Sequence, residues 1–578
     1  MAVRKRRQGA QRKPQPGLHI RYYAALVILF TVFAALIGRT AYLQVFDASA
    51  LVHQGDMRSL RSEGMNVQRG MIVDRNGREL AVSVPVETVW ADPKRIKEQH
   101  GFADMRRWQA LAETFRMNSE ELLAKVDDPS RRFVYLQRKI APSEANYVRQ
   151  LDIPGVYLKT ESRRYYPTGE ISAHVVGLTN VDGQGQEGLE LLYNDVLTGT
   201  PGERVYRKDA QGRVVEEVSQ RAAQQPKQLT LSIDQRLQAV AYTELKKAVR
   251  YNQATSGSVV ILDVKTGEVL AMVNSPSYNP NNRADLQPYK MRNRAITDAY
   301  EPGSTMKPLV VLTALEQGIV KVNDTVDTNP GWYRLGGRRI SDARNYGKLT
   351  ISQILEHSSN VGVSKLALRL GADNVLQTFF DVGFGSGTGV SLLGESYGIF
   401  GGRRSWSDAE LATLSFGYGL SVTTLQLAKA YSIIASGGIK RPLTIFRQES
   451  PMPGERIFSE SNTRAVLKML ENVVQKGTAS EAKVPGYRIA GKTGTSRKSK
   501  ATGGYGDEYV ALFAGIAPVS NPRIVTVVTI NEPGGDNYYG GTAAAPVFAN
   551  IVSESMRILN IAPDNLDDSQ LRIAGTGG

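Results

Sequence analysis

Two pairs of serine and lysine, each with a spacing of three residues, are the first chemical signal in this sequence. They are Ser304 with Lys307 and Ser480 with Lys483. On a helix this spacing places the amine one turn from the hydroxyl, where a neutral lysine can activate the serine as a nucleophile. A Pro-Gly pair precedes Ser304 and an apolar run follows it. Ser304 is therefore expected at a helix N-terminus, whose free N–H groups stabilise an oxyanion, whereas the polar surroundings of Ser480 indicate only a helix cap.

Two more short patterns each occur twice. Ser-x-Asn begins at Ser277 and at Ser358, and Lys-Thr-Gly begins at Lys265 and at Lys492. Only the later copy of each follows Ser304, which gives the order Ser-x-x-Lys, Ser-x-Asn, Lys-Thr-Gly along the chain. Each motif alone is weak, but the ordered set is typical of enzymes that form a serine acyl-enzyme. Lys265 instead falls at the tip of an expected hairpin.

Composition and the remaining motifs exclude several other kinds of chemistry. The chain has no cysteine, so disulfides, thiolate metal sites and a cysteine nucleophile are excluded. No two of its five histidines are spaced to form a two-histidine metal face on a helix. The formal P-loop match at 486–493 has no helix after it, and the dinucleotide-type match at 183–188 follows no buried strand. We therefore expect no metal and no cofactor.

The N-terminal region has the composition of a membrane anchor. Residues 22–38 are uncharged and mostly apolar, and seven basic residues with no acidic one precede them. This predicts a retained signal anchor over 22–43, a cytoplasmic basic tail over 1–21 and an exported remainder, with a cleaved signal peptide as the alternative. About half of the formal net charge of +15 comes from residues 1–46, and no basic stripe with interleaved aromatics follows. We therefore expect no nucleic-acid partner.

The exported part divides near residue 226. Residues 69–93 have the alternation of a hairpin with an Asn-Gly turn, and 102–150 are richer in helical patterns. Beyond 226, strand-like segments at both ends enclose a long stretch of mainly helical pattern; these segments are 229–233, 258–264, 268–273, 508–517 and 523–530. The arrangement predicts an α+β domain over 227–561, after a separate domain over 60–226 and before a flexible tail over 562–578.

The ordered motifs belong to a resemblance that extends well beyond them. EPGSTMKP, SSN and GKTGT, in this order, resemble the penicillin-binding, serine-acyl-transferase superfamily. RGMIVDRNGRELAVSVPV, SPSYNPNN and LSFGYGLSVTTLQLA resemble class B penicillin-binding proteins, and within them the division-specific FtsI type of Gram-negative bacteria, over roughly residues 40–560. The resemblance implies an antiparallel sheet flanked by helices, an all-helical subdomain, an elongated non-catalytic pedestal of the dimerisation type and one transmembrane helix.

The resemblance also implies a role for each residue of the ordered motifs. The substrate would be the D-Ala-D-Ala end of a peptidoglycan stem peptide, and Ser304 would be the nucleophile that forms the acyl-enzyme. Lys307 would be the general base, kept neutral by burial and by the like charge of Lys492, and Ser358 would relay a proton. The residues that would bind substrate are Asn360, Lys492, Thr493, Gly494 and Thr495. The backbone N–H groups of Ser304 and Thr495 would form the oxyanion hole.

The family further implies partners, a location and alternatives. β-Lactam antibiotics would be covalent inhibitors, and an FtsW-type glycosyltransferase and other divisome proteins would be partners. The chain would be a single-pass protein of the bacterial inner membrane, with its catalytic domain in the periplasm at the division septum. An elongation-specific class B transpeptidase and a D,D-carboxypeptidase remain alternatives. A β-lactamase is disfavoured, because the middle motif is Ser-Ser-Asn where class A β-lactamases have Ser-Asp-Asn.

Overall fold

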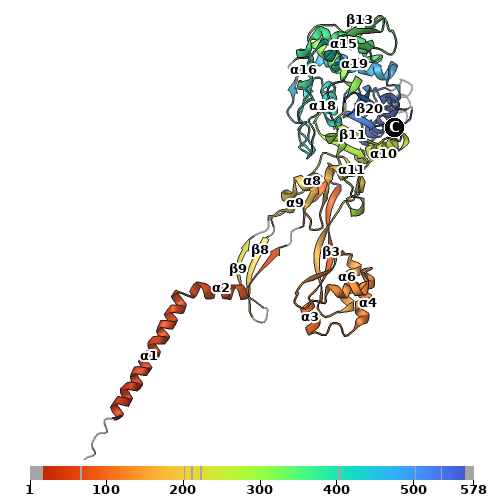
Figure 1. Ribbon diagram of the computed structural model, residues 1–578. Coiled ribbons are helices and arrows are strands. Elements are labelled where there is room, and N and C mark those ends of the chain that lie inside the picture. Colours follow the sequence, from red (N-terminus) through yellow and green to blue (C-terminus); the bar gives the residue numbers. More distant parts are fainter. Residues whose placement is uncertain are drawn as a thin grey trace, which may run out of the picture. The chain divides into compact units, whose positions relative to one another are not determined.

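The chain forms two compact units in the computed structural model (Figure 1). One unit comprises residues 1–67 with 200–225, and the other comprises 68–199 with 226–578. The structure describes residues 17–65, 68–200, 202–209, 213–221, 224–400, 405–500, 503–535 and 537–565. The two units are described separately below.

The first unit joins two helices to a small antiparallel sheet. Helix α1 (Gly17–Val45) contains the apolar segment Ile20–Val45, which has a mean hydropathy of 2.1 and is long enough to cross a membrane. Helix α2 (Ala48–Ser59) follows, and strands β1 (Leu60–Met65), β8 (Gly202–Lys208) and β9 (Val214–Arg221) pair in that order. The expected anchor over 22–43 therefore lies within α1, whereas most of the expected basic tail lies outside the described residues.

The second unit begins with a sheet backed by helices. Its strands are β2 (Ile72–Val73), β3 (Glu79–Ala91), β4 (Val134–Ile140), β5 (Val156–Tyr165) and β10 (Leu229–Thr230). The expected Asn-Gly turn joins β2 to β3, with Gly77 at a φ of 81°. Strand β4 interrupts the stretch 102–150, where the sequence indicated mainly helix. The helices beside this sheet are α3 (Pro93–Glu98), α4 (Met105–Thr114), α5 (Ser119–Lys125) and α6 (Pro142–Leu151).

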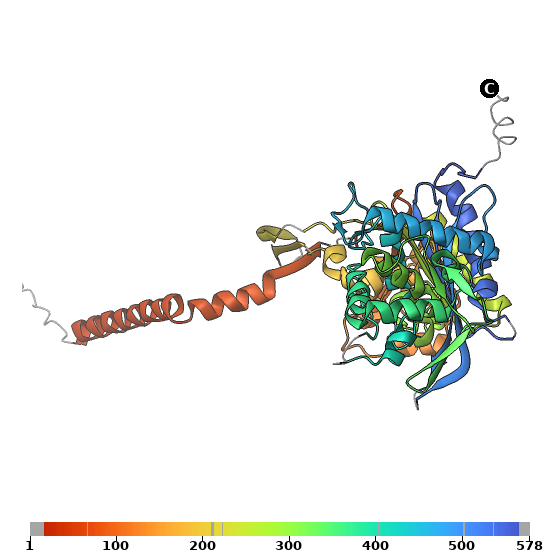
Figure 2. The same cartoon turned by 90° about the horizontal axis from the view of Figure 1, so that it is seen from above.

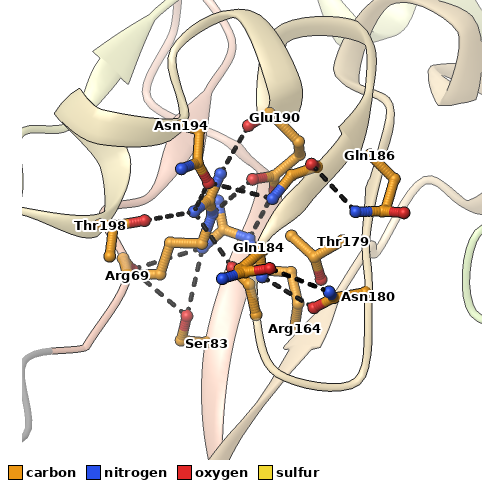
Figure 3. A network of polar contacts seen from close by, with 12 residues as sticks. Arg69, Ser83, Arg164, Thr179, Asn180, Gln184, Gln186, Glu190, Asn194 and Thr198 are labelled. Carbon is orange, nitrogen blue, oxygen red and sulfur yellow. Dashed lines mark hydrogen bonds and ion pairs between the residues drawn. The ribbon is translucent and has the colours of Figure 1, made fainter.

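A buried charge network fastens strand β5 to the segment that precedes β2 (Figure 3). Glu190, on helix α8 (Gly188–Leu192), is fully buried and accepts hydrogen bonds from Arg69 Nε and Arg164 Nε, both at 2.6 Å. Arg69 also donates to Asn194 Oδ1 at 2.9 Å. A buried carboxylate without a partner is strongly destabilising, so the two guanidinium groups allow this acid to lie inside the protein.

The larger sheet of this unit has helices on both faces. Its strand order is β12 (Val269–Ser275), β11 (Ser256–Asp263), β21 (Ile524–Asn531), β20 (Tyr505–Ala517) and β19 (Ala490–Ser499), all antiparallel. Successive strand residues face opposite sides of a sheet. A β-carbon on Gly257 would lie 2.8 Å from Leu245 of helix α10 (Gln235–Tyr251). On the other face, the hydroxyl of Ser258 contacts Thr424 of helix α18 (Thr424–Ala435) at 2.8 Å. The sequence-distant hairpins therefore close one sheet, as expected for an α+β domain.

The helices that cover this sheet fall into two groups. Helices α10 (Gln235–Tyr251) and α21 (Ala545–Ile558) pack together on one face, and α18 (Thr424–Ala435) lies on the other. The remaining helices of this region are α13 (Lys307–Glu316), α14 (Ile351–Glu356), α15 (Asn360–Leu370), α16 (Ala372–Asp381), α17 (Asp408–Leu414) and α19 (Glu460–Lys476). Of these, α15, α16 and α19 are labelled at the upper end of Figure 1, and Figure 2 shows the region from above.

Short elements complete the described chain. The short helices are η1 (Gly169–Ile171), α7 (Ala173–Val176), α9 (Asn194–Thr198), η2 (Arg283–Asp285), α11 (Pro288–Met291), α12 (Arg294–Thr297), η3 (Gly303–Met306), η4 (Ser480–Ala482) and α20 (Gly540–Ala543). The short strands are β6 (Leu178–Thr179), β7 (Gly185–Glu187), β13 (Thr325–Asp327), β14 (Trp332–Leu335), β15 (Arg338–Ser341), β16 (Lys348–Thr350), β17 (Ile439–Lys440) and β18 (Glu455–Arg456).

Candidate active site

Ser304 lies in the turn that leads into a buried helix. The 3₁₀ turn η3 continues directly into α13, whose side chains are almost all buried. A β-carbon on Gly417 would lie 2.2 Å from the carbonyl oxygen of Gly303, so the turn rests on another backbone segment at a distance that only glycine permits. Ser304 itself is half-buried, and its hydroxyl makes no hydrogen bond to another residue within the described parts of the chain. It is therefore free to react.

Lys307 is fully buried one turn after Ser304. Its Nζ donates to Asn360 Oδ1 at 2.7 Å and to the Ser358 carbonyl oxygen at 2.5 Å, and it lies 3.1 Å from Ser358 Oγ. Burial, and next the positive charge of Lys492, hold the pKa of Lys307 well below its ordinary value, and Asp342 opposes this shift. Two causes therefore favour the neutral form of Lys307, and burial is the larger of the two.

Ser358 occupies the tight connection between α14 and α15. Its φ of 54° is in the left-handed region, which is uncommon for a residue with a β-carbon and is often found at functional sites. This conformation places its hydroxyl between two amines, with Oγ at 3.1 Å from Lys307 Nζ and at 3.1 Å from Lys492 Nζ. One hydroxyl that contacts both amines can pass a proton between them.

Lys492 reaches this hydroxyl from the edge of the large sheet. It is fully buried on strand β19, and burial lowers its pKa to about 7. Among the described strands, β19 pairs only with β20, so its other side can take up an extended peptide. Lys492 therefore lies on an edge strand of the described sheet.

The rest of the Lys-Thr-Gly-Thr motif packs against the nucleophile turn. A β-carbon on Gly494 would lie 2.8 Å from the Pro302 carbonyl oxygen, and one on Gly303 would lie 3.1 Å from the Thr495 carbonyl oxygen. The hydroxyl of Thr495 accepts a hydrogen bond from the Gly540 N–H at 3.0 Å. The strand and the turn are therefore in contact at the positions where the oxyanion hole is expected.

Asp342 is a member of the site that the sequence did not reveal. Its carboxylate accepts hydrogen bonds from Ser359 Oγ at 2.6 Å and from the Val361 N–H at 2.9 Å, so it holds the start of α15 in place. Asn360 Nδ2 donates to the Ser341 carbonyl oxygen at 3.1 Å, so both ends of the Asn360 amide contact protein groups here. Asp342 belongs to no motif, and only the fold brings it to this site.

The duplicate motifs lie elsewhere. Ser480 and Lys483 are both exposed at η4, and Lys265 is exposed at the turn between β11 and β12, as expected. Ser277 is buried and donates its hydroxyl to the Glu170 carbonyl oxygen at 2.7 Å, which gives it a structural role. The P-loop match runs into strand β19, and no helix directly follows that strand in the described chain.

The assembled groups suit acyl transfer. A free serine hydroxyl, two buried amines of lowered pKa, a bridging hydroxyl and an open strand edge lie together. Among the described residues no group of three or more histidine, aspartate or glutamate side chains is arranged to hold a metal ion.

Comparison with known proteins assigns the chain to a family. Residues 257–553 match the penicillin-binding protein transpeptidase domain, and residues 65–231 match the penicillin-binding protein dimerisation domain. The chain is 49% identical over 558 residues to the peptidoglycan D,D-transpeptidase FtsI of Escherichia coli K12, covering 95% of each chain. This chain belongs to the penicillin-binding transpeptidases.

Other members of the penicillin-binding transpeptidases agree with this assignment. The chain is 40% identical to the probable peptidoglycan D,D-transpeptidase PenA of Neisseria gonorrhoeae, covering 93% of this chain and 92% of that one. Among solved structures, a peptidoglycan synthetase from Bifidobacterium adolescentis matches with a TM-score of 0.71 and 27% identity, over 88% of this chain and 99% of that one. Penicillin-binding protein 3 of Mycobacterium tuberculosis, complexed with aztreonam, matches with a TM-score of 0.67 and 28% identity, over 87% and 98%. The expected penicillin-binding transpeptidase fold is confirmed.

Proposed function

We propose that this chain is a peptidoglycan D,D-transpeptidase that crosslinks stem peptides of the septal cell wall through a serine acyl-enzyme. The observation that carries the proposal is the convergence of three distant segments on one hydroxyl. Ser358 Oγ lies 3.1 Å from the amines of both Lys307 and Lys492, beside the turn that holds Ser304. The relatives named FtsI and PenA, which cover nearly the whole chain, support the same reaction.

In the first half-reaction, Ser304 Oγ attacks the carbonyl of the penultimate D-alanine. Its proton passes to the neutral amine of Lys307, which burial keeps in the base form. The carbon–nitrogen bond then breaks, and the terminal D-alanine leaves with a proton delivered through Ser358. The product is an ester between Ser304 and the shortened stem peptide. The backbone N–H groups of Ser304 and Thr495 stabilise the oxyanion.

In the second half-reaction, an amine of a neighbouring stem attacks this ester. The amine loses a proton to Lys307, the carbon–oxygen bond breaks, and Lys307 returns this proton to Ser304 Oγ, which regenerates the hydroxyl. If water takes the place of the amine, the same site acts as a D,D-carboxypeptidase, and this remains the second candidate. Product analysis with a stem-peptide donor, with and without an amine acceptor, distinguishes the two. A crosslinked product supports the transpeptidase, whereas hydrolysis alone at every acceptor concentration would contradict it.

Strand β19 and the residues beside it bind the substrate. The extended stem peptide pairs with β19 as an added strand, and its terminal carboxylate meets the amine of Lys492 with the hydroxyls of Thr493 and Thr495. Asn360 holds an amide of the peptide after its present contacts rearrange. Gly494 has a steric role, because a side chain there would strike the Pro302 carbonyl oxygen.

The acyl-enzyme is tested with a fluorescent penicillin. Ser304→Ala is expected to abolish covalent labelling, because the change removes the hydroxyl on which the proposed ester forms. Ser480→Ala, in the duplicate motif, is the matched control and should label like the original protein, since Ser480 is exposed at η4. Equal labelling of the Ser304 variant would remove the basis for the mechanism.

We also infer the arrangement of the chain across the inner membrane. Residues 1–21 form a cytoplasmic tail, α1 provides the anchor over 22–43, and the pedestal over 60–226, the catalytic domain over 227–561 and the tail over 562–578 lie in the periplasm. The excess of basic residues before Tyr22 supports this orientation. A reporter that is active only outside the cytoplasm, fused after Gly578, should be active. Activity of a reporter that works only in the cytoplasm, fused at the same position, would contradict this orientation.

The proposed setting is the division septum, with an FtsW-type glycosyltransferase and other divisome proteins as partners and β-lactams as covalent inhibitors. The relative from Escherichia coli bears the name FtsI, which supports division over elongation. Co-purification of the tagged chain with an FtsW-type protein from crosslinked cells tests the partnership. Recovery of an elongation-type glycosyltransferase in its place would favour the alternative role.

A further inference from the structure

A basic cleft lies away from the acyl-transfer site on the second unit. It is a cavity of about 470 Å³ bordered by the turn after β11, the end of α18, the start of α19 and the turn between β20 and β21. It shares no lining residue with the site around Ser304. It does include Lys265, the first residue of the Lys-Thr-Gly copy for which the acyl-transfer site has no use.

Basic residues outnumber acidic ones in the lining of this cleft. Lys265, Arg441, Arg464, Lys468 and Arg488 line it, against the single acid Glu460. Most of these charges are already paired, because Arg464 bonds Glu460, and Lys468 and Arg488 both bond Glu471. Lys265 and Arg441 have no ion pair with any described residue. The cleft therefore has an excess of positive charge that the rest of the described fold does not balance.

Two arginines at the cleft also have unsatisfied donors. Nε of Arg441 and Nε of Arg523 are buried, and neither has a hydrogen-bond acceptor among the described residues. Arg523 directly follows Pro522 of the lining, and its carbonyl oxygen accepts the Val264 N–H at 3.0 Å, which ties it to the Lys265 turn. Buried donors normally have partners, so these two guanidinium groups keep hydrogen-bonding capacity that no described residue uses.

The floor of the cleft is apolar. Ile434 is 1% exposed, Leu467 7% and Val519 8%, and all three lie in the lining between the basic residues. A free phosphate ion would pair with the cations, but it has no apolar groups that could cover this floor. A peptide with aliphatic side chains between acidic ones satisfies both features, since its carboxylates reach the guanidinium and ammonium groups while its aliphatic groups leave water.

We propose that this cleft docks a short acidic peptide segment of another protein, with aliphatic side chains between its carboxylates. Lys265 and Arg441 form the charged rim, and Ile434, Leu467 and Val519 form the apolar floor. The cleft is therefore a docking surface that is separate from the chemistry at Ser304, and a peptide bound there leaves the acyl-transfer site open.

The proposal is tested on the full chain in detergent by fluorescence anisotropy. The probe is a short fluorescein-labelled peptide that alternates glutamate and leucine, beside the same peptide with glutamine in place of glutamate. We expect the acidic peptide to bind, the neutral one not to bind, and Lys265→Glu to weaken binding about tenfold or more, because a rim charge is reversed. Arg441→Gln should weaken it as well. Fluorescent-penicillin labelling reports that each variant is folded.

The matched control reverses a charge outside the cleft. Lys97→Glu, on exposed helix α3 of the pedestal, makes the same change in net charge and should leave peptide binding as it was. Three results would overturn the proposal. They are equal binding of the neutral peptide, unchanged binding by a labelled Lys265→Glu variant, and displacement of the acidic peptide by inorganic tripolyphosphate at equal charge, which would make the cleft a phosphate site.

Discussion

At the scale of single residues, the shared hydroxyl of Ser358 couples the two active-site lysines. Lys307 must be neutral to accept a proton. The positive charge of Lys492, which is present below and near its own pKa of about 7, helps to lower the pKa of Lys307. Removing that charge raises the pKa of Lys307, so a higher pH is needed to reach the base form. In Lys492→Ala we therefore expect the rising limb of the pH–acylation profile to move to higher pH, with slow acylation near neutrality that partly recovers above it. The measurement is fluorescent-penicillin acylation from about pH 5 to 11, a range that covers both the lowered and the ordinary lysine pKa.

Lys492→Arg is the control for this prediction. A guanidinium keeps its charge throughout that pH range, so the rising limb should not move upward even if the larger group slows the reaction. Profiles that fall in parallel at every pH in both variants would show that Lys492 binds the carboxylate without affecting the pKa of Lys307.

At the scale of elements, the nucleophile turn is held by a backbone contact between η3 and the segment after α17. A β-carbon on Gly417 would lie 2.2 Å from the Gly303 carbonyl oxygen. Gly417→Ala should therefore push η3 out of place and slow fluorescent-penicillin acylation by about a hundredfold, because small displacements of reacting groups cost that much. The rate of labelling, with the melting temperature, tests this.

Gly419 provides a close control. It has a φ of +85°, against +87° for Gly417, but a β-carbon there would meet no atom within 4 Å. Gly419→Ala therefore adds similar backbone strain without a steric clash against another segment. It should lower the melting temperature but leave most of the acylation rate. Equal loss of rate in the two variants would mean that backbone strain alone, and not the contact with Gly303, controls the turn.

At the scale of the whole molecule, attachment and chemistry reside in different units. The long apolar helix α1 belongs to the first unit, whereas Ser304, Lys307, Ser358 and Lys492 all belong to the second. Deleting residues 1–45 should therefore leave penicillin labelling intact in purified protein and release the chain from membranes.

In dividing cells a fluorescent fusion of the full chain should concentrate at midcell, as expected for a septal enzyme.

Cell fractionation tests whether the shortened chain leaves the membrane, with an exported version of that chain for comparison. Imaging of the full-length fusion tests its position in dividing cells. Loss of labelling on deletion of α1 would show that the anchor is needed for the site itself. Uniform labelling of the lateral wall by the full chain would contradict the septal role and favour the elongation-specific alternative.

Much of this protein follows from the sequence alone, because the determinants are local or ordered along the chain. A long uncharged segment predicts α1, since only apolar side chains suit a membrane core. Alternation and turn residues predict the hairpin at β2 and β3 and the strands at both ends of the catalytic domain. The surroundings of the two Ser-x-x-Lys copies selected Ser304 over Ser480, and the order of the motifs selected Lys492 over Lys265. The structure places both rejected copies at exposed positions.

Other features needed the tertiary structure, because they depend on which distant segments meet. The sequence predicts a lowered pKa for Lys307, but only packing shows that burial is the larger cause and that Asp342 opposes it. The positive φ of Ser358 and the contact of Gly417 with Gly303 leave no local signal, since each is imposed by neighbours far away in the chain. The same holds for the basic cleft, whose lysines and arginines come from segments that are remote from one another in the sequence. Local patterns specify elements and order, whereas burial and convergence of charges are properties of the folded chain.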